Sequence, residues 1–410
     1  MNVAVAGRWL WGAVVLGAMS SAIAEPRPAS LATFAPARLA ALGPILLDRD
    51  LVLLEFDGHG GLKQLSALTL VAAPPELVRE AVIHPERYPE FVRNMKRSRV
   101  AAEPGGTLWH EYAISYRVYT VEGRHRYVFV PKGAADAVAP VEMYDPDADG
   151  TRHYRWEFVP AGGATVLVLY GFTKIAHDGF SSRYLDKAPT LEAGFALIPH
   201  LTLLYSMKSR AEQLSGGKVP PPTGSKAGWE FLLERGTVAM LMSSGGRVRE
   251  VILIERSTAS TQSLLAVAGN PARWASFVPT MRRSTALGEG GVDAVEIEQS
   301  LPLMNWTTRW AYRLSGSSVD LFGLAGDLRG GRLRWDVKTD ASGLSQLVLR
   351  AVADFQNGSV LLREVYKLEP YLEYGFDVAL NLLLLQSVRR HAEQLAQGSS
   401  MATKAYPSAR

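Results

Sequence analysis

The sequence predicts an α+β protein of two similar domains, each an antiparallel sheet followed by one long C-terminal helix. Three observations lead to this fold class. Residues 46–98 align without a gap onto residues 232–284, at a constant offset of 186. Alternating apolar and polar runs follow in each copy, and each copy ends in a helical apolar pattern, at 191–214 and 372–395. A repeat of this length indicates duplicated domains rather than a solenoid.

The elements of the first copy follow in a legible order. Residues 51–56 and 65–71 have the strand pattern on either side of a Gly-rich turn. Residues 74–83 begin with proline and predict a short helix. Four alternating runs predict further strands, and a long apolar stripe predicts the final helix: 108–121, 124–130, 153–159, 165–175 and 185–214. A curved sheet needs cover on its inner face, and the long helix is large enough to provide it.

The domain boundaries follow from the repeat and from composition. We expect a signal peptide over 1–24, a first domain over 40–214, a Gly/Pro/Ser-rich linker over 215–228, a second domain over 229–397 and a disordered tail over 398–410. A chain of 410 residues is too long for one typical core and suits two medium-sized domains.

The N-terminus has the features of a secretion signal. Arg8 precedes the apolar run Leu10–Met19, and a small-residue site ends at Ala24. The apolar run is too short to span a bilayer, so the pattern predicts a cleaved signal peptide. We therefore expect a periplasmic or secreted protein, cut after Ala24.

Composition excludes several classes of site. The chain contains no cysteine, which excludes disulfides, thiolate metal ligands and a cysteine nucleophile. The net charge of +4 is small for this length, and no nucleic-acid partner is expected. Residues 145–150 imitate the start of a calcium loop, but Trp156 stands where that loop needs Glu. No His pair has the spacing of a helix-borne zinc site, so neither a metal nor another cofactor is expected.

One phrase is written twice in the chain. Residues 84–98 are HPERYPEFVRNMKRS, and residues 270–284 are NPARWASFVPTMRRS. Both copies keep a proline, an arginine, an aromatic residue, Phe-Val, a methionine, a basic pair and a serine. The second copy loses the histidine and the acids of the first, which favours a structural corner and cavity lip over a catalytic role.

The element order and this phrase resemble the START-like (SRPBCC) superfamily, in its coenzyme-Q-binding and polyketide cyclase branch. The phrase matches that branch at Tyr88, Pro89, Phe91 and Val92, and again at Trp274, Phe277, Val278 and Pro279. It departs at Met95 and Met281, where the family has cysteine, and at Arg93 and Ala275, where it has proline. The resemblance implies tandem helix-grip domains, each a curved antiparallel sheet wrapped around a long C-terminal helix. In each domain, the sheet and the helix would enclose a deep apolar cavity.

Stripes of aromatic residues with polar atoms suit the wall of such a cavity. The expected ligand-binding residues are Tyr112, Tyr116, Tyr127, Trp156, Phe195, Ile198, Trp306, Trp310, Tyr312, Trp335 and Phe376. The expected cavity mouth comprises Phe91, Val92, Phe277 and Val278. The alternative interpretation is that these aromatic side chains fill a solid core.

Two glycines interrupt the long helices at equivalent points. Gly194 and Gly375 each cost a helix interior about 1 kcal/mol relative to alanine. They indicate a close approach of another backbone, a bend, or the true start of each helix. Pro199 adds a kink to the first helix only.

The predicted function is binding or transfer of a hydrophobic small molecule, such as a lipid, quinone or sterol-like compound, without catalysis. Transient contact with a membrane surface is also expected, through the basic residues in and beside each phrase. A second interpretation is a cyclase or dehydratase that uses His110, His125 and His153, which fall on neighbouring strands. A third is a scaffold without a ligand.

Overall fold

The structure is a computed structural model that describes most of the chain from residue 30 to residue 404. The described ranges are 30–102, 107–116, 119–133, 138–146, 152–173, 189–217, 219–226, 228–244, 247–289, 292–301, 304–352 and 370–404. The expected signal peptide over 1–24 lies outside these residues, as does the end of the chain, 405–410.

The first unit begins with two short helices and ends with a long one. Its elements are α1 (Pro36–Ala40), α2 (Gly43–Leu46), β1 (Asp50–Phe56), β2 (Leu62–Val71), α3 (Pro75–Ile83), η1 (Pro85–Arg87), α4 (Tyr88–Phe91), β3 (Met95–Ala102), β4 (Leu108–Tyr116), β5 (Tyr119–Phe129), β6 (Val141–Tyr144), β7 (Arg152–Ala161), β8 (Ala164–Thr173) and α6 (Pro189–Ser215). The repeated phrase forms η1, α4 and the start of β3, and so makes the corner between α3 and the sheet.

The second unit repeats this order of elements. It comprises η2 (Glu230–Glu234), β9 (Thr237–Ser244), β10 (Arg247–Ser257), α7 (Thr261–Ala268), η3 (Pro271–Ser276), β11 (Met281–Glu289), β12 (Val292–Leu301), β13 (Met304–Ser315), β14 (Ser318–Gly326), β15 (Arg332–Thr339), β16 (Ser345–Val352) and α9 (Pro370–Lys404). The last helix therefore continues into the segment expected as a disordered tail from residue 398. None of the helices in the described ranges is long and apolar enough to cross a membrane.

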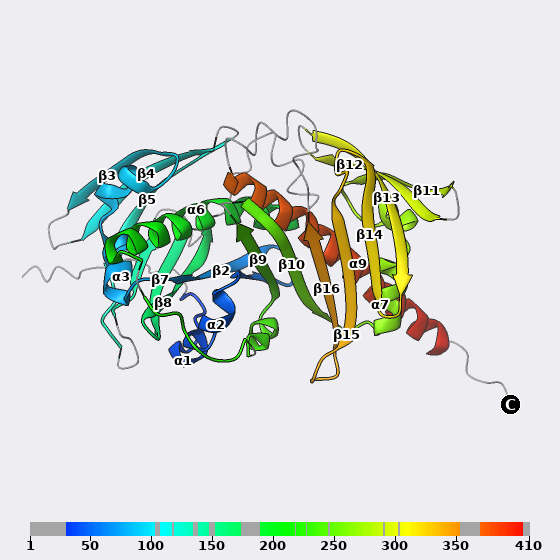
Figure 1. Cartoon of the computed structure of the whole chain (residues 1–410), viewed down its shortest axis with the longest axis horizontal. Coiled ribbons are helices and arrows are strands. Elements are labelled where there is room, and N and C mark those ends of the chain that lie inside the picture. Colours follow the sequence, from blue (N-terminus) through cyan, green and yellow to red (C-terminus); the bar gives the residue numbers. More distant parts are fainter. Residues whose placement is uncertain are drawn as a thin grey trace, which may run out of the picture.

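The strands of both units form one antiparallel sheet of sixteen strands (Figure 1). Its order is β11-β12-β13-β14-β15-β16-β10-β9-β1-β2-β8-β7-β6-β5-β4-β3. Each half is a curved sheet with its own long helix on the inner face, so the predicted tandem helix-grip fold is confirmed. The sequence did not predict that the two halves would join into a single sheet.

The two halves join where β1 pairs with β9. In this seam Val52 lies opposite Ala239, and Leu53 lies opposite Val238. The offset of 186 between the copies converts one pair into the other, so the seam has the two-fold geometry of a symmetric dimer interface within one chain. The open edges of the sheet are then β3 and β11, which are equivalent strands. Both begin with the basic residues of the repeated phrase, and charge on an edge strand opposes pairing with another sheet.

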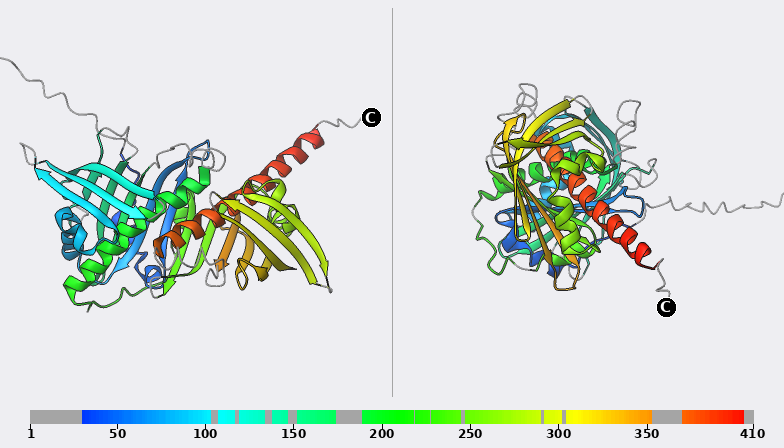
Figure 2. Two further views of the ribbon diagram at one scale, coloured as in Figure 1. Left: turned by 90° about the horizontal axis from the view of Figure 1, so that it is seen from above. Right: turned by 90° about the vertical axis from the view of Figure 1, so that its right-hand side faces the viewer.

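The two long helices cross at the equivalent glycines. A Cβ atom on Gly194 would lie 2.2 Å from Cβ of Ala379 and 2.6 Å from the main-chain oxygen of Gly375. A Cβ atom on Gly375 would in turn lie 2.3 Å from a side-chain carbon of Ile198. Both helices begin five residues before their glycine, so the close-approach interpretation holds, and the glycines do not mark the helix starts. In Figure 2, the N-terminal halves of the helices overlap near the middle of the molecule, and their C-terminal halves run toward opposite ends.

Around this crossing, each helix contributes to the core of the other unit. Leu191 of α6 packs in a cluster with Trp306 of β13, whereas the equivalent Leu372 of α9 packs with Tyr116 of β4. The rings of Phe195 and Phe376, also equivalent, meet edge to face with centroids 5.5 Å apart. The two units are thus interlocked by helices as well as by the sheet.

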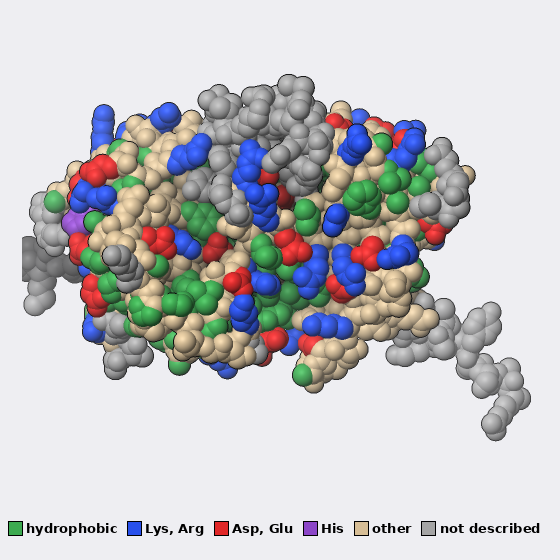
Figure 3. Space-filling model, in the orientation of Figure 1, with side chains coloured by type: hydrophobic (Ala, Val, Ile, Leu, Met, Phe, Trp, Pro, Cys, Tyr) green, Lys and Arg blue, Asp and Glu red, His purple; other side chains and the backbone are tan. Residues whose placement is uncertain are grey.

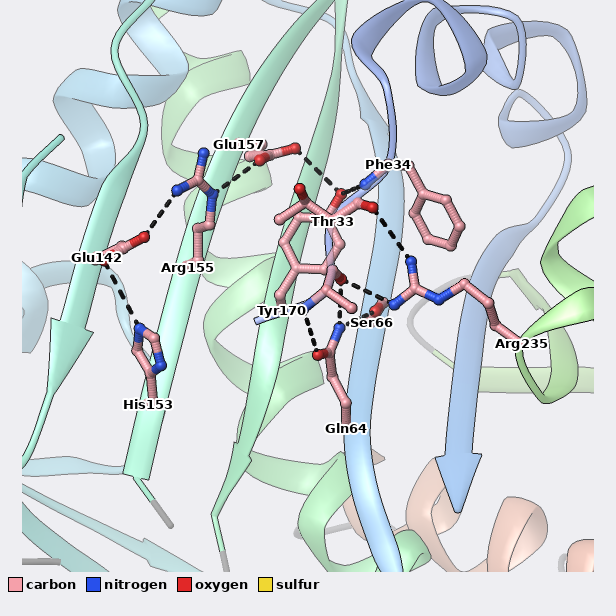
Figure 4. A network of polar contacts seen from close by, with 11 residues as sticks. Thr33, Phe34, Gln64, Ser66, Glu142, His153, Arg155, Glu157, Tyr170 and Arg235 are labelled. Carbon is pink, nitrogen blue, oxygen red and sulfur yellow. Dashed lines mark hydrogen bonds and ion pairs between the residues drawn. The ribbon is translucent and has the colours of Figure 1, made fainter. Parts of the chain in front are cut away.

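A second layer covers the outer face of the central strands. Helices α1 and α2 pack with η2 against the outer face of the sheet on both sides of the β1–β9 seam. Arg235, at the end of η2, makes a bidentate ion pair with Glu55 of β1. It also donates to the main-chain oxygens of Ala32 and Thr33 (Figure 4). This cover makes β1 and β2 almost continuously buried, since it adds to the burial of their inner face by the long helices.

Replacing Gly194 by alanine tests the crossing. The added methyl group would meet a backbone oxygen and a second Cβ, so we expect a loss of about 1–3 kcal/mol in the free energy of unfolding, although alanine is the better helix former. Gly398→Ala is the matched control, because nothing lies within 4 Å of a Cβ at that position in α9. Chemical denaturation measures both variants. Equal stability of Gly194→Ala and the parent protein would contradict the crossing.

Candidate functional site

Each unit contains a cavity between the inner face of its half-sheet and its long helix. The first cavity is lined by Tyr88, Met95, His110, Tyr112, Ile114, Val121, His125, Tyr127, Met143, Tyr154, Trp156, Pro199 and Leu203. The second is lined by Trp274, Met281, Ile297, Gln299, Trp310, Leu328, Gly331, Leu333, Ala351, Val352, Asp377, Leu380, Asn381 and Leu384. The space open to the centre of a water molecule is about 20 Å³ in the first and about 60 Å³ in the second. The first therefore has room for about one water, and the second for a few.

The first cavity is lined by a continuous series of buried polar rings. His110 of β4 lies directly opposite His125 of β5, and both project to the inner face. The ring of His125 lies 4.7 Å from that of Tyr112 and 5.2 Å from that of Tyr154, centroid to centroid. The ring of Tyr154 in turn lies 5.3 Å from that of His200 on α6. This series joins the sheet to the helix across the cavity.

Hydrogen bonds fix several of these rings in place. Oγ of Ser98, in the repeated phrase, lies 2.8 Å from Nε2 of His110. The hydroxyl of Tyr88 donates to the main-chain oxygen of Val82 at 2.7 Å and lies 3.2 Å from the hydroxyl of Tyr127. The phrase thus supplies two wall residues of the cavity, Tyr88 and Met95, which sequence reasoning did not include among the site residues.

Burial keeps the histidines of this series of rings uncharged. It lowers the pKa of His110 to about 4 and that of His125, which also has His110 beside it, to about 3. The pKa of His200 is lowered to about 4, although its ring nitrogens lie 2.7 Å and 2.9 Å from two main-chain oxygens, which oppose the effect of burial. At neutral pH all three rings can accept or donate hydrogen bonds as neutral imidazoles.

Two equivalent tryptophans carry unused donors. Trp156 and Trp335 occupy the same point of β7 and β15, and both are fully buried. The indole Nε1 of each has no hydrogen-bond partner among the described residues. A buried N–H without a partner is uncommon. Trp156 lines the first cavity, so its Nε1 marks a place where a ligand oxygen would be stabilised, whereas Trp335 is not among the wall residues of the second cavity.

The second cavity has the same plan but different chemistry. By strand pairing, Trp310 of the second unit is equivalent to His125 of the first. By the sequence repeat, Trp274 is equivalent to Tyr88. The long helix adds Asp377, which is 3% exposed and stands where α6 has Ala196. Sequence reasoning missed Asp377, although an acid within the apolar stripe of a helix is a detectable signal.

The other predicted ligand-binding residues lie apart from the two cavities. Tyr116 donates to Oγ1 of Thr202 on α6 at 2.9 Å, and Ile198 packs at the helix crossing. Phe195, Phe376 and Trp306 also lie at that crossing.

Tyr312 lies in an open groove at the surface, beside Arg313, and not in the second cavity. The sequence predicted that the stripe containing Tyr312 would be the counterpart of the stripe on β4. It lies on β13 instead, which is the counterpart of β5. Trp306, Thr308 and Trp310 are buried in alternation, and the stripe leaves the core beyond Trp310. Leu314, at its end, is 58% exposed.

The residues expected at the cavity mouth are packed rather than open. Val92 and Val278 are buried. The guanidinium of Arg210, from α6, lies 5.6 Å from the ring centre of Phe91, and the ring of His391, from α9, stacks on Phe277 at 4.3 Å. Each long helix therefore closes its corner of the sheet with an equivalent side chain.

The basic residues of the two phrases do not form a patch of one sign. Arg97 lies 3.8 Å from Glu122, and Arg283 lies 3.3 Å from Glu296. On the face shown in Figure 3, basic and acidic side chains likewise alternate over the strands of the second unit.

His153 does not join the other two histidines. It precedes Tyr154 on β7, and successive residues of a strand project to opposite faces, so His153 lies on the outer face. Its Nε2 lies 3.8 Å from Glu142, beside Arg155 and Glu157 (Figure 4). The structure therefore corrects the expectation that His110, His125 and His153 meet in one cavity. No group of three or more potential metal ligands occurs in the part of the chain that the structure describes.

No family model matches the sequence, and no curated protein sequence matches it. Among solved structures, the chain is similar to two di-domain ARO/CYC proteins. One is StfQ from the steffimycin biosynthetic pathway, with 14% identity, 80% of this chain and 99% of that chain covered, and a TM-score of 0.27. The other is BexL from the BE-7585A biosynthetic pathway, with 13% identity, 78% and 98% covered, and a TM-score of 0.25.

A third similar structure is a STAR-related lipid transfer protein fragment from Xanthomonas axonopodis. Its identity is 12%, 38% of this chain and 93% of that chain are covered, and its TM-score is 0.29. Likenesses with such TM-scores carry no argument about function, which must come from the cavities themselves.

The buried histidines make stability depend on pH. Their pKa values lie below the ordinary 6.5, so the unfolded chain binds more protons than the folded one below about pH 6.5. We expect the free energy of unfolding to fall as pH drops from 6.5 toward 3, by about 3 kcal/mol for a group such as His110. Urea unfolding across this range should show a shallower loss for His125→Phe, whereas the exposed His59→Gln should follow the parent protein. A His125→Phe curve parallel to the parent's would contradict this assignment.

Proposed function

We propose that the first unit binds an apolar small molecule that carries hydroxyl or carbonyl oxygens, and that it does so without chemical change. One observation carries this proposal: the wall of the first cavity is a series of buried polar rings that includes the unpartnered donor Nε1 of Trp156. Aromatic rings offer a ligand a large apolar area together with single hydrogen-bonding atoms. A lipid, quinone or sterol-like compound has this combination.

A ligand must displace side chains to enter this cavity. The free space of about 20 Å³ is far below the volume of a typical small-molecule pocket. Met95 and Met143 line it, and a methionine side chain repacks more readily than a branched or aromatic one. Binding therefore depends on repacking of these thioethers.

The protonation of the histidines favours binding over catalysis. A general base works best when its pKa lies near the operating pH. Burial puts the pKa of His110 at about 4 and that of His125 at about 3, so both are weak bases at neutral pH. A cyclase that relies on these two rings is the competing proposal. It would require turnover that His125→Phe abolishes.

Export and transfer are part of the same proposal. The segment before residue 25 has the charged start, apolar run and small-residue end of a cleaved signal. The N-terminal sequence of the protein recovered from the periplasm or the medium tests this. A mature chain that begins at Glu25 would support export, and an uncleaved cytoplasmic chain would contradict it.

Trp156→Phe tests the donor in the first cavity. Removing the indole N–H should weaken binding of a quinone or sterol about threefold to tenfold, because one hydrogen bond contributes about 0.5–1.5 kcal/mol. Trp335→Phe is the matched control, since it makes the same change at the equivalent site of the second unit. Affinity is measured by quenching of intrinsic fluorescence and by native mass spectrometry of the complex. Absence of any bound or added apolar ligand in the parent protein would overturn the proposal.

A further inference from the structure

The second cavity contains a buried carboxyl group that has no partner among the residues that the structure describes. Asp377 faces this cavity and is 3% exposed, with Trp274, Trp310 and Leu384 among the other wall residues. No hydrogen bond and no ion pair with another described residue reaches its carboxyl oxygens. Only its main-chain oxygen is engaged, by Nδ2 of Asn381 at 2.7 Å. Such a group costs free energy unless something pairs with it.

The fold does not require an acid at this position. The first unit places Ala196 at the equivalent point of α6, and both helices cross in the same way around their glycines. An alanine therefore satisfies the packing. The acid is explained by a partner that enters the cavity.

A second buried acid lies beside Asp377. Glu373, one helical turn earlier, is 6% exposed, and its Oε2 has no hydrogen-bond partner. Arg247 and Arg249, at the start of β10, act on Glu373 but are not paired with Asp377.

The other elements packed against α9 supply no counterion. Helix α7 has no titratable side chain, and α6 contributes the uncharged Phe195 at the crossing. Arg350 of β16 lies 3.6 Å from Asp336 at the surface. A cation entering the cavity would meet no positive charge beside Asp377 in these elements.

The polar atoms of the wall include acceptors and donors. Oε1 of Gln299 accepts from Nε1 of Trp306, which leaves its amide N–H groups as donors. Asn381 uses its amide N–H to bond the main chain, which leaves its Oδ1 as an acceptor. The carboxyl of Asp377 adds two oxygens. The faces of Trp274 and Trp310 also favour a cation.

We propose that the second cavity is a separate binding site for a compact apolar amine, with Asp377 as the counterion of its ammonium group. The ammonium supplies the positive charge that pairs with Asp377, and the apolar part packs against Trp274 and Trp310. This site does not depend on the ligand of the first unit. The two units would then bind molecules of different classes in equivalent places.

Benzylamine and its uncharged match, benzyl alcohol, test the site by titration calorimetry on the full chain. We expect benzylamine to bind at least about tenfold more tightly, since hydrogen bonds to charged groups contribute about 1.5–3 kcal/mol. Asp377→Asn keeps the size of the side chain and should erase this preference. Trp156→Phe should leave it unchanged, which separates this site from the function proposed for the first unit. Equal binding of amine and alcohol, or a preference that survives in Asp377→Asn, would overturn the proposal.

The pH dependence gives a second test on the unaltered protein. Burial and the neighbouring Glu373 raise the pKa of Asp377 well above its ordinary value, so an ammonium ligand must expel a proton from this carboxyl. The affinity for benzylamine should therefore increase as pH rises from about 6 to about 8. A neutral carbonyl ligand would instead accept a hydrogen bond from the protonated acid, and its affinity would fall. Falling amine affinity over this range would contradict the counterion role.

Discussion

The close crossing of α6 and α9 is the constraint on which the rest of the structure depends. Two glycines at equivalent positions let the helix backbones approach until a Cβ on either would overlap its neighbour. This approach allows each helix to place its first-turn leucine in the core of the other unit. The β1–β9 seam then needs only to join two sheets that the helices already align. One chain thereby contains a two-fold interface of the kind that usually joins two subunits.

Symmetry of the backbone leaves the side chains free to diverge. The two cavities occupy equivalent positions, yet one is lined by tyrosine and histidine and the other by tryptophan, asparagine and an acid. The shared features are structural: the phrase that turns into the sheet, the glycines and the buried indoles. The differences lie on the cavity walls, where a change of residue alters the ligand and not the fold.

Much of the fold could be predicted, because it is written in local patterns. The repeat, the alternating strands and the long apolar stripe gave two domains with the observed elements, apart from α1, α2 and β6. The site was predictable only in part. Tyr112, Tyr127 and Trp156 line the first cavity, whereas Tyr312 lies in a groove at the surface because its stripe continues beyond the second cavity. His153 was grouped with His110 and His125, but strand alternation turns it to the outer face.

The sequence by itself determined the identity of most elements, their duplication and the equivalent positions of Gly194 and Gly375 in the two long helices. These features depend on periodicity and on backbone preferences, which act over a few residues. The tertiary structure alone decided what the glycines approach, that the sheets merge at β1 and β9, and that Asp377 stands unpaired in a cavity. Those outcomes depend on contacts between residues more than a hundred positions apart, and on how side chains fill the space between a helix and a sheet. No local pattern encodes either.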